Sequence, residues 1–421
     1  MNFCEKVAEV GERMKAQSVS LKQSLLEKKI IEVTDNELPE GINRLFYNHS
    51  LNKSEVFDTL FEDKCSKNTF TKKIDKAIAE GHVDEPIFHH KKHLYTRFHI
   101  AQILDYFEFP KFSDNHLPFV LNIANHKGGV GKSTTTVTLA IKMALDLDLN
   151  AKVVIVDLDP QGSSARGIIQ VDESGEQHYI TIADLQCFDR EDEAEPNQVK
   201  ELIDNGLDYD DIVLASAFNT HLPNLDVITA FPSDEKFSDY FFESDEKKQV
   251  QLITRLREKI IPVLQSKYDI IILDLPPQNS PIVWSAFEAS NGVITPLAPK
   301  AYDYASTESF LPTIGNAVSK MPGKGKDIQY FRILATNYDE REKHERKIYN
   351  QLINSVGEDL IPTAINHSPL FLEAAGQNCT IYDIKKSESR CTALQYDEAI
   401  YSSNAVYKTV IGELKRKTFK G

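Results

Sequence analysis

The sequence predicts an α/β fold with a mostly parallel central sheet, preceded by a smaller helical domain and an N-terminal helix. Two observations indicate the sheet. Continuous apolar runs alternate with stretches of helical character from residue 119 onward, as expected for strands covered by helices on both faces. A glycine-rich turn also joins the first apolar run to a helical stretch over 135–147. The predicted strands are 119–124, 153–157, 225–230, 270–274, 292–295 and 332–335.

The composition fits a protein of two or three domains. At 421 residues the chain is too long for one ordinary core, and its hydrophobic fraction of 41% is typical of globular proteins. No run approaches the roughly 18 apolar residues of a membrane span, and the N-terminus lacks the apolar core of a signal peptide, so a cytoplasmic location is expected. The cysteines are scattered without a C-x-x-C pair, which favours reduced thiols over a disulfide framework or a zinc site. They are Cys4, Cys65, Cys187, Cys379 and Cys391.

Charge is unevenly distributed along the chain. The net charge is −15, and a uniformly acidic surface would repel nucleic acid. Between Lys64 and Arg97, however, eight lysines and arginines stand against four acidic residues. The run 189–195 is acidic and indicates a solvated loop. The basic stretch therefore keeps a nucleic-acid contact open despite the overall charge.

Residues 1–37 predict an N-terminal helix. Apolar residues recur there near a three-to-four spacing, with charged residues between them. Such a stripe must be buried somewhere, and both a dimer contact and packing on the chain's own body are open. The stripe consists of Val7, Val10, Met14, Leu21 and Leu25.

Residues 38–112 predict a small DNA-binding domain of the winged helix-turn-helix type. Short helices are expected over 41–47, 53–61, 69–80 and 100–107, and a two-stranded ribbon over 83–90 and 93–98. The basic third helix would be the DNA-reading helix. An ordinary helical appendage with a solvated lysine face is the alternative. The candidate DNA-binding residues are Thr71, Lys72, Lys73, Lys76, Lys91 and Lys92.

The turn at 127–134 has the composition of a phosphate-binding loop, and it predicts that residues 113–421 form a P-loop NTPase domain. Glycines let backbone N–H groups crowd an anion, and the following helix adds the positive end of its dipole. Lys132 would reach the β- and γ-phosphates, and the Ser133 hydroxyl would hold Mg²⁺. The residues expected to bind nucleotide here are Gly128, Gly129, Val130, Gly131, Lys132, Ser133 and Thr134.

The loop departs from the usual G-x-x-x-x-G-K-[ST] pattern at its start. His126 stands where the pattern has glycine, and a second lysine, Lys127, opens the loop. Because the loop wraps the phosphates between Lys127 and Lys132, Lys127 cannot easily fold back onto its own nucleotide. It can reach the nucleotide of a second subunit, and this predicts a homodimer.

Polar residues at the ends of later strands complete the predicted site. Asp157 and Asp159 alternate at one strand end, so one could serve the metal's water shell while the other orients the attacking water. Asp274 ends another strand in the form of a Walker B segment and would hold Mg²⁺ through water. Asn337 offers an acceptor and donors suited to an adenine edge. The alternatives are helix-capping acids for the first pair and an Asx turn for Asn337.

The motifs KGGVGKST, VDLDPQ and DIILDLPP, in this order, resemble those of ParA-type plasmid and chromosome partition ATPases. These belong to the ParA/MinD group, and the two-lysine loop is its deviant Walker A box. The resemblance covers roughly Leu117 to Tyr401, and the N-terminal layout is similar to that of the longer, type Ia members. It implies that Lys127 reaches into the partner's site, that Asp159 orients the attacking water, and that Asn337 touches the base. Ser133, Asp157 and Asp274 then remain for Mg²⁺.

The resemblance also implies a function and partners. Two ATP molecules would lie between two subunits, and the ATP-bound dimer would coat DNA without regard to sequence. A ParB-type protein at a centromere-like site would stimulate hydrolysis to ADP and release the ATPase from DNA. The N-terminal domain would bind operator DNA and repress the partition operon, with the protein associated with the nucleoid. Basic clusters at 341–347 and 408–420 give partial support for phosphate contacts.

Three other functions compete with this one. A MinD-like membrane-cycling ATPase would use a C-terminal amphipathic helix, but the apolar stripe at 406–414 has no Trp and is more simply packed on the domain. A NifH-like electron carrier would need cysteines after the Walker B segment, and none occurs between Cys187 and Cys379. A repressor that uses nucleotide only as a ligand is disfavoured by Asp159 beside an intact Lys132.

Overall fold

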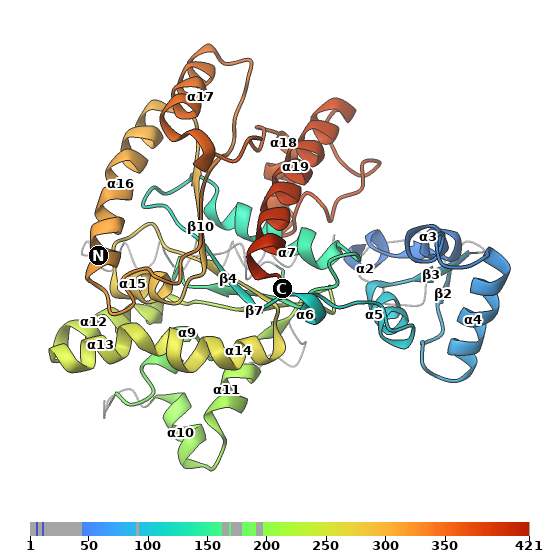
Figure 1. Ribbon diagram of the computed structural model, residues 1–421, viewed down its shortest axis with the longest axis horizontal. Helices are drawn as coiled ribbons and strands as arrows, with labels where there is room; N and C mark the ends of the chain where they lie inside the picture. Colours follow the sequence, from blue (N-terminus) through green and yellow to red (C-terminus); the bar gives the residue numbers. More distant parts are fainter. Residues whose placement is uncertain are drawn as a thin grey trace. The chain divides into compact units, whose positions relative to one another are not determined.

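The computed structural model describes residues 6, 11, 44–89, 92–161, 168–169, 179–190 and 197–420. The chain divides into two units, Met1–Phe109 and Pro110–Gly421 (Figure 1). Each unit has a core of its own and is described by itself. Apart from two isolated positions, the predicted helix over 1–37 lies outside the described residues.

The first unit combines short helices with a three-stranded antiparallel sheet of order β1-β3-β2. Its elements are α2 (Arg44–Asn48), β1 (Leu51–Asn52), α3 (Lys53–Leu60), α4 (Lys67–Ala79), β2 (Ile87–His89), β3 (Lys92–Tyr95) and α5 (Arg97–Tyr106). The second ribbon strand ends earlier than expected because α5 begins there, with the Thr96 N–H donating to His99 Nδ1 at 3.1 Å. Strand β1 was not predicted; it ends at Asn52, whose side chain caps α3.

Helix α4 is the basic helix of the first unit. Ser66 caps its N-terminus, its hydroxyl accepting from the Thr69 N–H at 3.3 Å. The buried face is formed by Phe70, Ile74 and Ala77. The Phe70 ring packs on Phe61, with centroids 4.8 Å apart. This packing turns the lysines of α4 toward solvent.

The second unit is built on a seven-stranded sheet of order β10-β9-β4-β8-β5-β7-β6. The first six strands of this order pair in parallel, and the edge strand β6 pairs antiparallel with β7. The predicted mostly parallel sheet is therefore confirmed, although β6 was missed and β9 and β10 are longer than expected. The strands are β4 (Phe119–Ile123), β5 (Val153–Asp157), β6 (Phe218–Asn219), β7 (Leu225–Ile228), β8 (Ile270–Asp274), β9 (Gly292–Leu297) and β10 (Tyr330–Ala335).

Alternate residues of the central strands face two different cores. In β8, Ile270 and Ile272 pack in the core that contains α7 and α19, whereas Ile271 and Leu273 pack with α14 and α15 on the other face. Figure 1 shows α7 and α19 on one side of the sheet and α14 on the other. Burial on both faces explains why these strands are unbroken apolar runs in the sequence.

The helices of the second unit follow the strands and cover both faces of the sheet. They are α6 (Phe112–Asn115), α7 (Lys132–Leu145), α9 (Ile182–Gln186), α10 (Gln198–Asp204), α11 (Tyr209–Ala215), α12 (Lys236–Glu243), α13 (Glu246–Arg255), α14 (Ile261–Lys267), α15 (Pro281–Glu288), α16 (Ala301–Lys320), α17 (Lys343–Val356), α18 (Pro369–Gly376) and α19 (Ala393–Thr418). A π-helical turn over Leu256–Ile260 joins α13 to α14.

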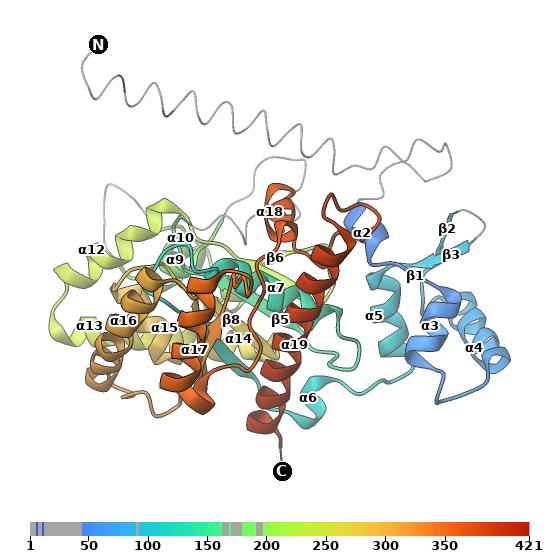
Figure 2. The same cartoon turned by 90° about the horizontal axis from the view of Figure 1, so that it is seen from above.

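The two ends of the second unit lie side by side. The Leu117 N–H donates to the Thr418 carbonyl at 2.8 Å, and the Lys420 N–H donates to the Asn115 carbonyl at 2.9 Å. Figure 2 shows the end of α19 beside α6. The apolar stripe at 406–414 of α19 is buried in the core with α7, as expected for a helix packed on its own domain.

Candidate nucleotide site

The glycine-rich turn forms a loop between β4 and α7. Gly129 and Gly131 have φ of 78° and 83°, in the left-handed region that favours glycine. Gly131 is the N-cap of α7, and its carbonyl accepts from the Thr135 N–H at 2.8 Å. The helix begins at Lys132, three residues before the predicted start, so its N-terminus meets the loop. This arrangement directs helix N–H groups and the dipole toward an anion in the loop.

Lys132 closes the loop from within. Its side chain is buried, and its Nζ donates to the Lys127 carbonyl at 3.2 Å. Burial lowers the pKa of Lys132, while the nearby carboxylates of Asp274 and Asp159 oppose that shift. A desolvated ammonium held in a fixed place is suited to stabilising phosphate charge.

Two strand ends bring carboxylates together next to the loop. Strands β5 and β8 are parallel neighbours, and Asp157 pairs in register with Asp274. Each residue is only 1% exposed. Burial raises the pKa of Asp274 to about 6, although the Ser133 hydroxyl and the Lys132 charge oppose the rise. Among the described residues, neither Asp274 oxygen has a hydrogen-bond partner of good geometry.

These oxygens fit a magnesium ion. Mg²⁺ prefers hard oxygen ligands and keeps several of its own waters, so a hydroxyl and carboxylates nearby are a suitable donor set. Ser133, Asp157 and Asp274 offer such oxygens. The two buried Asp274 oxygens, which have no hydrogen-bond partner of good geometry among the described residues, are also atoms that a hydrated cation would satisfy.

Asp159 lies beside this group and is half-buried. Its N–H donates to Asp157 Oδ1 at 3.0 Å, and its own Oδ1 accepts from the Gln161 N–H at 2.9 Å. The two aspartates therefore shape consecutive turns at the strand exit. The negative charges of Asp159 and Asp274 both act on Lys132 and oppose the lowering of its pKa.

Asn125 is a supporting residue that the sequence did not reveal. It is 2% exposed and donates to the Pro296 carbonyl at 2.7 Å and to Thr307 Oγ1 at 2.9 Å. Its Oδ1 accepts from the Lys127 N–H at 3.0 Å. One amide thus ties the start of the loop to β9 and α16. An amide directly after a strand is the signal that singled out Asn337, and it could have found Asn125 as well.

The end of β10 holds the other side of the loop. Thr336 Oγ1 donates to the Val130 carbonyl at 2.8 Å. The next residue, Asn337, has a φ of 51°, and its Oδ1 lies 2.7 Å from His367 Nδ1. Asn337 is therefore held at the strand exit by a partner distant in sequence.

A cavity of about 280 Å³ lies between the loop and Asn337. Its far wall, residues 365–372, was not predicted because no motif marks it. The cavity links the loop glycines to Asn337, as a base pocket next to a phosphate site requires. The lining residues are Gly129, Gly131, Thr134, Thr135, Thr138, Thr336, Asn337, Ile365, Asn366, His367, Ser368, Phe371 and Leu372.

The second loop lysine takes a different direction from the first. The Lys127 side chain is 44% exposed, and its Nζ lies 4.0 Å from Asp303 Oδ1 on α16. His126 is exposed, and its ring lies 6.4 Å from that of Phe310, also on α16. Only the backbone of Lys127 contributes to closing its own loop.

Known proteins are similar to the part of the chain that contains this loop. A family model described as an AAA domain matches residues 119–326. Plasmid partition protein A of Escherichia coli is 25% identical over 284 residues, 62% of this chain and 62% of the relative. The chromosome-partitioning ATPase Soj of Thermus thermophilus is 28% identical over 262 residues, 62% of this chain and 85% of the relative. The chain is therefore similar to ParA-type partition proteins, the group whose motifs its phosphate loop and strand-end aspartates resemble.

The length and fold of other matches bear on how far this likeness extends. The chain spans 66% of the length of a putative replication protein A of Rhizobium rhizogenes, to which it is 23% identical. It spans 62% of the length of the Escherichia coli relative. A solved partition protein has the same fold as this chain, with a TM-score of 0.64 at 18% identity over 99% of both chains. An ATP complex of McdA from Cyanothece has a TM-score of 0.50 at 17% identity, covering 71% of this chain and 97% of that one.

The candidate DNA-binding residues lie in the first unit. On α4, Lys72, Lys73 and Lys76 are exposed, whereas Thr71 is half-buried and its hydroxyl donates to the Lys67 carbonyl at 2.9 Å. Lys92 is exposed at the start of β3, and Lys91 lies outside the described residues. The lysine face is thus solvent-accessible, while Thr71 is already engaged by its own helix.

Proposed function

We propose that this protein is a DNA-partition ATPase that binds and hydrolyses ATP as a homodimer. In its ATP state it binds DNA without sequence preference and segregates plasmid or chromosome DNA with a ParB-type partner. The observation that carries the proposal is the divergence of the two loop lysines. Lys132 is buried within the loop, whereas Lys127 extends outward toward Asp303.

The residues at the sheet edge divide the chemical work. Lys132 and the loop N–H groups hold the β- and γ-phosphates. Ser133, Asp157 and Asp274 hold Mg²⁺, which supplies charge neutralisation at the phosphates when bound. Asp159 orients the attacking water, and Asn337 contacts the base. Phosphoryl transfer needs mainly positioning and neutralisation of charge, so this set suffices for hydrolysis.

Lys127 acts on the nucleotide of the second subunit. Its ammonium is exposed enough to leave Asp303 for a phosphate, because a pair at 4.0 Å with a 44% exposed lysine is weak. Lys127→Ala should therefore keep ADP affinity and lose the ATP-dependent dimer, as measured by ultracentrifugation. Lys408→Ala, an exposed lysine on α19, is the matched control. An unchanged ATP-dependent dimer in Lys127→Ala would exclude the cross-subunit role.

DNA contacts come from basic surfaces in both units. In the first unit the exposed lysines of α4 and Lys92 fit a winged helix-turn-helix that also binds operator DNA and represses the operon. In the second unit, exposed basic residues gather at the start of α17 and toward the end of α19. These are Arg341, Lys343, Arg346, Lys347, Lys408, Arg416, Lys417 and Lys420.

The test is binding of a random DNA fragment by the full chain with no nucleotide, with ADP or with ATP, across a salt series. The proposal expects tight, salt-sensitive binding chiefly with ATP. Equal binding in all three states would remove the nucleotide control of DNA binding. No binding at any salt would favour a membrane-cycling ATPase, to be tested on anionic vesicles.

The membrane alternative has little support from α19. Val406, Val410, Ile411 and Leu414, its apolar stripe, are all buried in the core of the second unit. Among the described residues, no helix has both the length and the apolar character needed to cross a bilayer. An amphipathic anchor built from α19 would first have to leave that core.

A further inference from the structure

An apolar groove of about 400 Å³ runs along α16, away from the residues assigned to nucleotide. Its walls come from α15, α16, β9 and β10. The lining is almost wholly apolar, and Lys324 is its one charged residue. The lining residues are Phe287, Val293, Thr295, Phe310, Leu311, Ile314, Gly315, Val318, Ser319, Lys324, Ile328 and Phe331. A groove of this volume and lining has the character of a binding site.

The groove has room for an added side chain. A Cβ at Gly315 would meet no heavy atom within 4 Å, so a side chain could extend from α16 into open space. Thr295 is fully buried, and its hydroxyl has no hydrogen-bond partner among the described residues. Because Thr295 is fully buried, its hydroxyl lies beneath the groove floor and is not open to an occupant.

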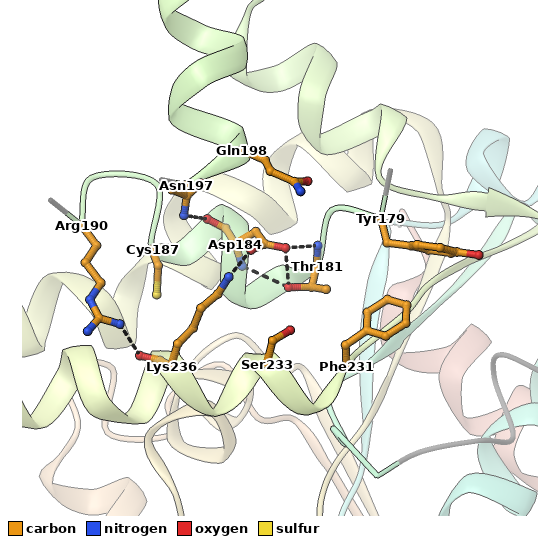
Figure 3. Close-up of a pocket in the computed structure, with 10 residues that line it drawn as sticks. All are labelled: Tyr179, Thr181, Asp184, Cys187, Arg190, Asn197, Gln198, Phe231, Ser233 and Lys236. Carbon is orange, nitrogen blue, oxygen red and sulfur yellow. Dashed lines mark hydrogen bonds and ion pairs between the residues drawn. The ribbon is translucent and has the colours of Figure 1, made fainter. Parts of the chain in front are cut away.

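The polar pocket between α9 and α12 differs from the groove in its lining. In Figure 3 its charged side chains turn toward one another, with Lys236 reaching Asp184 and Asn197 donating to the Asp184 carbonyl. Thr181 Oγ1 also donates to Asp184 Oδ2 at 2.9 Å. Those groups satisfy one another, so that pocket needs no ligand.

The mouth of the groove is basic. Of three exposed lysines at and after the end of α16, Lys324 lines the groove. The others are Lys320 and Lys326, and one acidic residue, Asp327, stands against the three. An occupant with acidic residues at one end would complement this charge. The apolar floor selects against a fully polar occupant such as nucleic acid.

Helix α16 also connects the groove to the phosphate loop. Phe310, which lines the groove, has its ring 6.4 Å from that of His126. About one turn before Phe310, the Thr307 hydroxyl accepts from Asn125. A further turn back, Asp303 lies beside Lys127. A change in the position of α16 would therefore reach three residues at the start of the loop.

We propose that this groove docks an amphipathic helical segment of a partner protein. The segment inserts a large aromatic side chain along the apolar floor, and its acidic residues face Lys320 and Lys324. Large aromatic residues with a polar edge are the usual anchors of such interfaces. Docking shifts α16 and thereby sets the position of Lys127. The docking goes beyond the proposed function, whereas its effect on Lys127 rests on that function.

The test uses a fluorescent synthetic peptide with Trp at position i, leucines at i+3 and i+4, and glutamates elsewhere. Its binding to the nucleotide-free full chain is measured by anisotropy, so failure of the ATPase proposal cannot affect the result. Gly315→Phe should fill the groove and weaken binding at least about tenfold. Gly412→Phe on α19, also a helical glycine with open space around its Cβ, should leave binding unchanged. Thermal unfolding verifies that both variants fold.

Two further arms test the charge and the aromatic anchor. Lys320→Glu with Lys324→Glu should weaken binding of the acidic peptide and strengthen binding of its lysine counterpart. Replacing Trp by Ala in the peptide should weaken its binding to the wild type at least about tenfold. No binding of the acidic peptide to the wild type, or equal binding by Gly315→Phe, would overturn the docking site. Equal binding of acidic and basic peptides would overturn the acidic partner.

Discussion

The phosphate loop of the second unit and helix α4 of the first unit both present lysines for phosphate groups, but they are built in opposite ways. Lys132 is 6% exposed and is fixed by a loop that Asn125 ties to Pro296 and Thr307. The lysines of α4 are exposed, and the nearby Lys53–Asp75 pair at 2.6 Å is itself partly solvated. One region fixes the position of its charge, and the other leaves its charge mobile in water.

The difference teaches what each region can recognise. A buried, fixed ammonium is strong because water is excluded, and it selects one ligand geometry. Solvated lysines contribute through counterion release, so they bind any polyanion and weaken steeply with salt. Nucleotide binding should therefore respond to geometry, and DNA binding by α4 should respond to charge count.

The largest expected effect comes from removing the fixed charge. Lys132→Ala should weaken ATP binding by at least about 100-fold, because truncating a buried charge loses more than an exposed contact. Calorimetry with ATP and Mg²⁺ measures this. Lys408→Ala, with an exposed lysine, is the control and should bind as the wild type does. A loss below tenfold would mean that the loop N–H groups hold the phosphates alone.

A smaller effect should follow when the charge stays but its support is removed. Asn125→Ala leaves Lys132 in place and deletes hydrogen bonds at the start of the loop, which should cost about tenfold in ATP affinity. Asn291→Ala is the matched control. The Asn291 side chain accepts from the Val120 N–H at 2.9 Å, at the start of β4 and thus at the other end of the strand from the loop. If both variants lose only stability, the loop is not positioned by Asn125.

For α4 the comparison predicts an effect that depends on salt. Lys72→Ala combined with Lys76→Ala should weaken DNA binding several-fold at low salt and reduce the slope of log affinity against log salt by about two. Filter binding without nucleotide, across a salt series, measures the slope. Lys247→Ala with Lys259→Ala removes the same charge from exposed positions in the second unit. Equal slopes for the two double variants would show that α4 does not contact DNA.

The last prediction concerns folding stability and a charged cluster that is neither fully buried nor fully exposed, Asp189 with Arg255 and Lys248. Burial favours the neutral form of Asp189, but hydrogen bonds from Arg255 and Lys248 outweigh it and lower the pKa of Asp189 to about 2. A lowered pKa stabilises the fold above about pH 4, and this contribution disappears as the pH falls toward 2. Asp189→Asn should therefore cost about 1–2 kcal/mol at neutral pH, with the difference closing below pH 4.

Urea unfolding at several pH values checks the Asp189 prediction. Asp397→Asn is the control, because the Lys386–Asp397 pair at 2.5 Å is about half exposed on both sides. Its effect should be at most about 0.5 kcal/mol at any pH. A pH-independent loss in Asp189→Asn would mean that packing, not charge, accounts for its effect.

The sequence predicted the strands best where burial on both faces dictated their composition. Strands β5 and β8 begin and end at the predicted residues. Strand β9 continues past its predicted end because Pro296 and Leu297 still pair with β10. Pro296, which has no N–H, lies beyond the register with β4. Strand β6 was missed because two residues carry no periodicity.

The site was predictable where one motif holds the residues together and not where the chain returns from afar. Lys132, Ser133 and the strand-end aspartates follow from local patterns. The wall over 365–372 and the bond between Asn337 and His367 depend on tertiary packing of segments without any marked motif. Asn125 stands directly after a strand, so its position could have been predicted from the same local signal as that of Asn337. Its partners, Pro296 and Thr307, are distant in sequence and could not.

The pairing of residues 115–117 with 418–420 holds the two ends of the second unit next to each other. Its ends could be joined by a short linker and the chain reopened elsewhere, for example at the exposed turn of Gly206 between α10 and α11. In such a permuted chain the phosphate loop would be synthesised late and not early. Retained nucleotide binding would mean that the order of the strands in the sheet, and not their order of synthesis, assembles the site.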